Sequence, residues 1–130
     1  MSKSTPSSNL PRAAWKHLSV DKLLVLFDHG TQRGIARSLH PQTVKEAKAQ
    51  GWDTLTNGEL LKVAEEAGCD LLLTTDKNLR VQQNLRSRKI AIVVLSNSRW
   101  RLVRRALDSI ATAVNAAKPG SYTVVDIPLG

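Results

Sequence analysis

LLLTTDKNLR, at residues 71–80, is a run of three leucines that ends in Thr-Thr-Asp-Lys. A short apolar run bounded by polar residues is typical of a strand that is covered on both faces. The same order of residues occurs earlier in KLLVLFDHGT, at residues 22–31, where Asp28 closes the apolar run. The two segments predict two buried strands, each followed by an aspartate, Asp28 in one case and Asp76 in the other.

Strand and helix patterns alternate outward from these segments. The expected strands are 22–28, 42–46, 70–76, 90–96 and 122–127. The expected helices are 31–39, 57–67, about 79–86 and 99–117. Because parallel neighbours need a crossover and the helices supply it, this alternation predicts an α/β fold, a three-layer sandwich with a mainly parallel, Rossmann-like sheet of four to five strands.

Two of the expected helices show clear faces. In the helix at 31–39, Ile35 and Leu39 are expected to point inward, and Arg33 and Arg37 outward. In the helix at 99–117, apolar residues recur at three- and four-residue steps and predict one buried stripe. The residues of that stripe are Trp100, Val103, Leu107, Ile110 and Val114.

The chain has 130 residues, 42% of them hydrophobic, which fits one domain with one core. Residues 1–20 are rich in Ser and contain no acid, so we expect a flexible or loosely docked leader there and the domain at 21–130. No stretch approaches the ~20 apolar residues that a membrane span needs. The N-terminus lacks the apolar middle of a secretory signal.

The charge balance indicates the kind of partner. The chain carries 19 Lys and Arg against 11 Asp and Glu, a net charge of +8. This surplus favours a polyanion such as nucleic acid, with an acidic protein as the alternative. Cys69 is the single cysteine and cannot form an intrachain disulfide, so a reducing, cytoplasmic location is expected.

The strand ends supply the candidate site. In a parallel sheet all carboxyl ends lie at one edge, and ligands bind there where the strand order reverses. If the strands before Asp28 and Asp76 are neighbours, the two carboxylates should face one crevice, about 4 to 6 Å apart, and share a cation such as Mg²⁺ or Mn²⁺. The alternative is that each aspartate caps the helix that follows it.

Glu59 is a third candidate acid. TLTNGELL, at residues 54–61, places it in the first turn of a helix that leads into the strand before Asp76. It could be a metal ligand at the same edge, or it could close a capping box with Thr56, and the sequence leaves both interpretations open. Asp53, in the same loop, is interpreted as a turn residue.

Three segments together resemble a known family. VLFDHGT, NGELLKVAEEAGCDLLLTTDKNL and IAIVVLS are similar to the PIN-like nuclease fold in its compact, toxin-like branch, over residues 22–96. The resemblance implies that Asp28, Glu59 and Asp76 hold one or two Mg²⁺ or Mn²⁺ ions and activate water to cleave RNA. It also implies a toxin that is held in check by an antitoxin protein, with a homodimer as a further option.

The sequence departs from this family at one place. The strand at 90–96 runs into LSNSRW, where a full site usually has a further acid, so one ion is better supported than two. A catalytically weak or silent relative that binds RNA or a partner protein is therefore the alternative function. A phosphohydrolase of the haloacid dehalogenase type is a third hypothesis, but FDHGT lacks the second aspartate of D-x-D-G-T.

Other polar residues have expected supporting roles. Hydroxyl and amide side chains near the strand ends could hold water or phosphate: Thr31, Thr75 and Asn97. Cationic side chains that could contact the phosphates of RNA around the crevice are Arg33, Arg37, Lys77 and Arg80.

Overall fold

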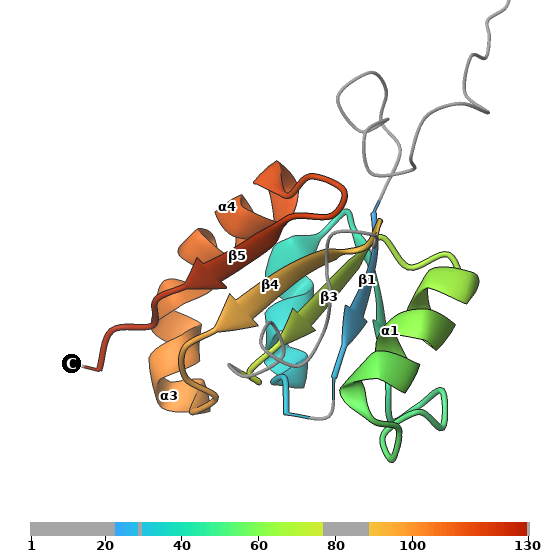
Figure 1. Ribbon diagram of the computed structural model, residues 1–130. Helices are drawn as coiled ribbons and strands as arrows, with labels where there is room; N and C mark the ends of the chain where they lie inside the picture. Colours follow the sequence, from blue (N-terminus) through green and yellow to red (C-terminus); the bar gives the residue numbers. More distant parts are fainter. Residues whose placement is uncertain (1–22, 29, 77–88, 130) are drawn as a thin grey trace, which may run out of the picture.

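A computed structural model describes residues 23–28, 30–76 and 89–129. Its centre is a five-stranded, fully parallel sheet with the strand order β2-β1-β3-β4-β5 (Figure 1). The strands are β1 Leu24–Phe27, β2 Thr43–Glu46, β3 Leu71–Thr74, β4 Ala91–Leu95 and β5 Tyr122–Val125. The described helices are η3 Arg33–Leu39, α1 Asn57–Glu66, α3 Trp100–Val103, η4 Arg104–Ala106 and α4 Leu107–Ala116.

The predicted α/β sandwich is confirmed. All five expected strands are present, each one to three residues shorter than the apolar pattern indicated. The shortening is largest at the polar ends: β3 stops at Thr74, although the expected strand continued to Asp76. The predicted helix near 79–86 and the leader at 1–20 lie outside the described residues.

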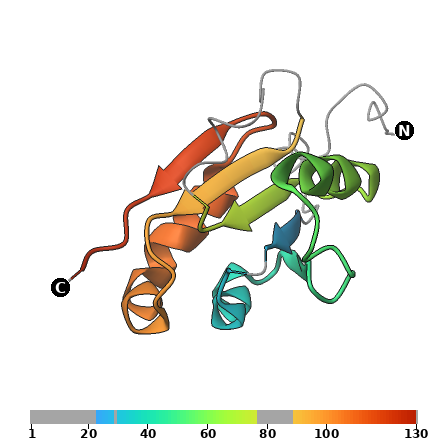
Figure 2. The same cartoon turned by 60° about the horizontal axis from the view of Figure 1, so that its bottom comes forward.

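Helices cover both faces of the sheet. One face packs against η3, α3, η4 and α4 through a large apolar cluster that includes Phe27, Ile35 and Ile110. The other face packs against α1 through a smaller cluster that includes Leu61 and Leu72. Figure 2 shows α1 on one side of the strands and η3 and α4 on the other. β3 and β4 are therefore buried on both faces, which explains their uninterrupted apolar sequences.

The segment at 31–39 forms a 3₁₀ helix, η3, instead of an α-helix. Its expected faces are nevertheless confirmed, since Ile35 and Leu39 are buried and both arginines are exposed. The helix ends at Leu39 because His40 precedes Pro41, and a residue before proline is disfavoured in helical conformation.

The prediction of one continuous helix over 99–117 is wrong. The segment is divided into α3, the 3₁₀ turn η4 and α4. A 3₁₀ turn advances 120° per residue where an α-helix advances 100°, so three such residues rotate the buried face by about 60°. Leu102 and Val103 of α3 and Ala106 of η4 face the core, while Trp100, the first residue of α3, is 38% exposed.

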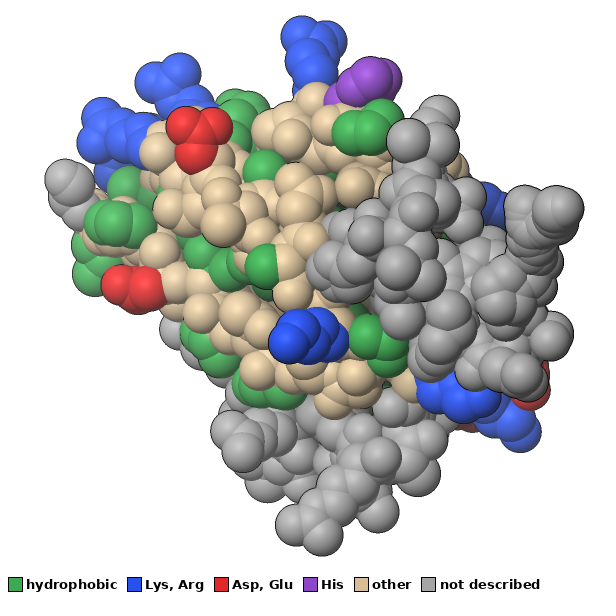
Figure 3. All heavy atoms as spheres, turned by 90° about the horizontal axis from the view of Figure 1, so that it is seen from above, with side chains coloured by type: hydrophobic (Ala, Val, Ile, Leu, Met, Phe, Trp, Pro, Cys, Tyr) green, Lys and Arg blue, Asp and Glu red, His purple; other side chains and the backbone are tan. Residues whose placement is uncertain are grey.

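Two surface features complete the description. Within the described ranges, no helix combines the length and the apolar character that crossing a membrane requires. Seen from above the view of Figure 1, the Lys and Arg side chains lie in several separate places and not in one group (Figure 3). The candidate acids Asp28 and Asp76 lie instead at the carboxyl ends of the strands.

Candidate functional site at the carboxyl edge of the sheet

The strand order reverses between β1 and β3. From β1 the chain moves outward to β2 on one side, and it then returns to form β3 on the other side. The two strands are hydrogen-bonded neighbours, with Phe27 opposite Leu73, so the condition on which the site hypothesis depended is met. Asp28 follows β1 directly and Asp76 lies two residues beyond β3. Both acids thus flank the point at which open α/β sheets bind ligands.

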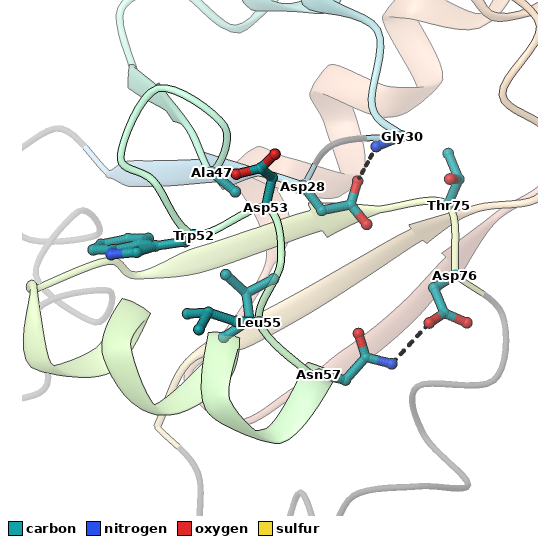
Figure 4. A pocket seen from close by; sticks show the side chains of 10 residues that line it. Asp28, Gly30, Ala47, Trp52, Asp53, Leu55, Asn57, Thr75 and Asp76 are labelled. Carbon is teal, nitrogen blue, oxygen red and sulfur yellow. Dashed lines mark hydrogen bonds between the residues drawn. The ribbon is translucent and has the colours of Figure 1, made fainter.

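Both acids line one hollow of about 270 Å³ (Figure 4). Asp53 lines it as a third carboxylate, while Trp52, Leu55 and Leu60 give it an apolar wall. No Lys or Arg is among the described side chains that line it. The full lining is Asp28, Gly30, Ala47, Trp52, Asp53, Leu55, Asn57, Leu60, Thr75 and Asp76. An anionic hollow of this kind attracts a cation.

The Asp28 carboxylate is held in place by three donors. Its Oδ1 accepts hydrogen bonds from the Gly30 backbone N–H at 3.2 Å and from the Thr31 hydroxyl at 2.7 Å. Its Oδ2 accepts one from the Thr74 hydroxyl. The bond from Gly30 is the short-range bond that an aspartate makes in a turn. Asp28 does not cap the helix that follows it, because the N-cap residue of η3 is Gln32, which has no side-chain cap hydrogen bond. Oδ2 is the oxygen with remaining capacity toward a ligand, as judged from the described partners.

Thr74 connects the two acids. Its hydroxyl donates to Asp28 Oδ2 and accepts a hydrogen bond from the Asp76 backbone N–H at 3.0 Å. The side chain is 1% exposed, so its hydroxyl is not readily replaced by water. A single buried hydroxyl therefore fixes the strand end of β3 against the carboxylate that follows β1.

Asn57 orients the second acid. Its Nδ2 donates to Asp76 Oδ2 at 2.8 Å, and Asn57 is the first residue of α1 (Figure 4). This contact joins the α1 start to the β3 end across the hollow. The sequence analysis missed Asn57, Trp52 and Thr74. Only Asn57 could have been found from the sequence, because it lies between the acids Asp53 and Glu59.

Glu59 has the capping role. Its Oε1 accepts hydrogen bonds from the Thr56 backbone N–H at 3.0 Å and the Thr56 hydroxyl at 3.1 Å. The Thr56 hydroxyl in turn accepts from the Glu59 backbone N–H, so the capping box is complete. The hydrogen bonds from Thr56, first that from its backbone and then that from its side chain, lower the pKa of the exposed Glu59 carboxyl. Glu59 is not among the residues that line the hollow.

The remaining candidates divide into three groups. Thr31 and Thr75 lie at the hollow, the first through Asp28 and the second in its lining. Arg33 forms an exposed ion pair with Glu46 at 3.0 Å, and both Arg33 and Arg37 line a different hollow. Asn97 Oδ1 accepts from the Arg99 backbone N–H at 2.8 Å. Lys77 and Arg80 lie outside the described residues.

The donor set fits a hard divalent cation. Mg²⁺ is usually held by one or two carboxylates and keeps several of its waters, and Asp28 and Asp76 offer such a pair. Within the described part of the chain, no three His, Cys, Asp or Glu side chains come together as a metal-binding group. Asp53 therefore reaches the same hollow without joining the other two acids in a cluster. The separation of 4 to 6 Å between Asp28 and Asp76 stays a prediction.

Comparison of the chain with family models, curated proteins and solved structures finds no match.

Proposed function

We propose that this protein is a metal-dependent ribonuclease of the PIN-like type. One observation carries the proposal: Asp28 and Asp76 follow the two neighbouring strands at the reversal of strand order, and they line the same hollow. The family label itself rests on the sequence resemblance and on the agreement of this arrangement with it.

The chain's own groups would hold the cation. Asp28 would offer Oδ2, since Oδ1 already accepts two hydrogen bonds. Asp76 would offer its carboxylate from the opposite side, steadied by the Asn57 amide. Mg²⁺ or Mn²⁺, when bound, supplies charge that offsets the negative charge developing on phosphate and lowers the pKa of bound water.

Other residues would position the RNA and the water. Thr75 lines the hollow beside Asp76 and could hydrogen-bond a phosphate oxygen or the attacking water. The hydrolysis would form a bond from the water oxygen to phosphorus and break the bond from phosphorus to one ester oxygen. The proton of the attacking water would pass to a carboxylate of the hollow, and the leaving ester oxygen would take up a proton from solvent water. Residues 77–88 contain four Lys and Arg and no acid, so the segment after Asp76 would bring positive charge to the phosphates.

A second function is favoured by the position of Glu59. Its carboxylate closes the capping box, and a site with two acids has fewer anionic ligands than the full family pattern. The corresponding alternative is a catalytically silent protein of the same fold that binds RNA or a partner protein.

The experiment is cleavage of a labelled single-stranded RNA with and without Mn²⁺. The proposal expects Mn²⁺-dependent cleavage by the wild type and its loss in Asp28→Asn. Asp126→Asn is the control, because Asp126 also directly follows a strand but is exposed and lies outside the hollow. No cleavage by the wild type would favour the silent alternative. Equal cleavage by Asp28→Asn would contradict the role proposed for Asp28.

The biological role expected from the resemblance is a cytoplasmic toxin with a cognate antitoxin protein. Growth of a bacterial host during induced expression tests it. The wild type should arrest growth, while Asp28→Asn at the same protein level should not.

A further inference from the structure

Trp100 is an unusual surface residue. It is 38% exposed, and it is the only aromatic among the large hydrophobic side chains that are exposed in the described ranges. The sequence pattern predicted it to be buried in the core. Aromatic rings supply much of the energy of binding surfaces, which makes a partly exposed indole a candidate contact for a ligand.

The ring lies flat on η3. A Cβ added to Gly34 would be 2.5 Å from Trp100 Cη2, 2.9 Å from Cζ2 and 3.0 Å from Cζ3. Three ring atoms at nearly equal distances mean that Gly34 faces the plane of the benzo ring and not its edge. Only glycine at position 34 leaves this space, so η3 covers one side of the indole.

The two chain segments that meet beside Trp100 are strongly basic. Segments 30–41 and 97–107 contain six arginines and no Asp, Glu or Lys. The two segments lie side by side, because Gln32 Nε2 donates to the Ser98 carbonyl at 2.8 Å. Both contribute to one open hollow, and we call it the Trp100 hollow; its lining is Arg33, Gly34, Ala36, Arg37, Ser38, Trp100 and Leu107. The six arginines, all exposed, are Arg33, Arg37, Arg99, Arg101, Arg104 and Arg105.

We infer that the Trp100 hollow binds single-stranded RNA, with one base stacked on the Trp100 ring and the neighbouring phosphates held by arginines. Stacking on an aromatic ring beside a basic surface is how proteins hold single strands without reading their sequence. Arginine suits this use because its planar guanidinium pairs with phosphate oxygens and stacks on bases. Arg33 is paired with Glu46, but this exposed pair is readily exchanged for a phosphate.

The hollow is placed to serve the acidic site. Thr31, which donates to Asp28, is only one residue before Gln32, which contacts the Ser98 carbonyl. An RNA strand held at Trp100 would therefore lead toward the carboxyl edge of the sheet, where Asp28 and Asp76 lie. In this sense the inference rests on the proposed function, although RNA binding at Trp100 can be measured without any cleavage.

The test is fluorescence anisotropy of a labelled oligouridine of about 8 nucleotides, without divalent cation and in the Asp76→Asn background, so that cleavage cannot intervene. Trp100→Leu should weaken binding by about 5- to 150-fold, the loss of one stacked base, and Trp100→Phe should recover part of it. A duplex of the same length should be insensitive to Trp100→Leu, because its bases are already stacked.

A charge-matched pair tests the phosphate contacts. Arg37→Ala with Arg104→Ala should lower the slope of log affinity against log salt by about 1.4, the value for two phosphates on a single strand. Lys62→Ala with Lys118→Ala removes the same charge from α1 and from the loop after α4, and it should change the slope much less.

Three outcomes would overturn the inference. The first is unchanged oligouridine affinity in Trp100→Leu, with circular dichroism showing that it is folded. The second is an equal change of slope in the two charge pairs. The third is tighter binding of polyglutamate than of oligouridine, which would favour an acidic protein partner. If binding behaves as expected and no Mn²⁺-dependent cleavage occurs, the inference holds and the nuclease proposal fails.

Discussion

The hydroxyl of Thr74 offers a sharp test of the site's architecture. Thr74→Val keeps the size and branching of the side chain and removes only the group that donates to Asp28 and accepts from the Asp76 N–H. A hydrogen bond to a charged group contributes about 1.5 to 3 kcal/mol, and an unsatisfied buried N–H costs about 1 to 3 kcal/mol. Asp28 and Asp76 are only partly buried, so water recovers some of the second loss. We expect a net destabilisation of about 2 to 3 kcal/mol.

Thr75→Val is the matched control, since it makes the same chemical change one residue later in a half-buried position. Its cost should stay within about 0.5 kcal/mol, as for most substitutions away from a buried network. Urea unfolding of both variants and the wild type, followed by far-UV circular dichroism, measures the difference. Equal stability of Thr74→Val and Thr75→Val would refute the view that the Thr74 hydroxyl holds the two acids together.

Two further predictions concern α1 and the Trp100 hollow. Because the Thr56 hydrogen bonds lower the pKa of Glu59, its contribution to stability is complete above the ordinary pKa of glutamate and is lost as pH falls through the lowered value. Glu59→Gln keeps the capping box but cannot ionise, so its free energy of unfolding should fall less on acidification than that of the wild type. Glu66→Gln is the control and should behave like the wild type. Identical pH profiles of the three proteins would contradict this prediction. Gly34→Ala should displace the Trp100 ring, because the new Cβ would lie 2.5 Å from it. In a Trp15→Phe/Trp52→Phe background, where Trp100 is the only tryptophan, acrylamide should quench its fluorescence more strongly in Gly34→Ala than with Gly34 retained. The free energy of unfolding should fall by about 1 to 2 kcal/mol, after the better helix propensity of alanine is counted. Unchanged quenching would contradict the close contact between Gly34 and the ring.

The sequence was sufficient for the features that depend on apolar periodicity. The runs before Asp28 and Asp76 predicted two buried strands, and both are present. Their adjacency, which the site hypothesis required as a condition, is found in the sheet. Alternation of strands and helices predicted the parallel sheet, because few other topologies accommodate it. The two aspartates line one hollow for the same reason, since parallel strands end at one edge.

Where one stretch of sequence allowed two local structures, the sequence alone could not decide between them. Thr56 and Glu59 have the spacing of a capping box, and the structure has that box complete, but the spacing alone could not exclude a ligand role. The break at η4 was missed because the apolar steps across 99–117 fit an unbroken helix, and a 3₁₀ turn leaves no clear mark in such a pattern. Trp100, at the start of α3, was expected in the core and is 38% exposed, whereas Val103 of the same turn is buried as expected.

The role of Thr74 was invisible for a different reason. A threonine at the end of a strand is an ordinary residue, and its contact with Asp28 joins positions 46 residues apart in the chain. Such long-range hydrogen bonds appear only once the register of β1 against β3 is known.

The most direct measurement of the central claim is a titration with Mn²⁺ that is monitored by electron paramagnetic resonance. The signal of free Mn²⁺ decreases as the ion binds to the protein. The account predicts saturable binding by the wild type, and a marked loss of affinity in Asp28→Asn and in Asp76→Asn but not in Asp126→Asn. Binding that survives in the Asp28→Asn/Asp76→Asn double variant, or no saturable binding by the folded wild type, would contradict a cation site between these two acids.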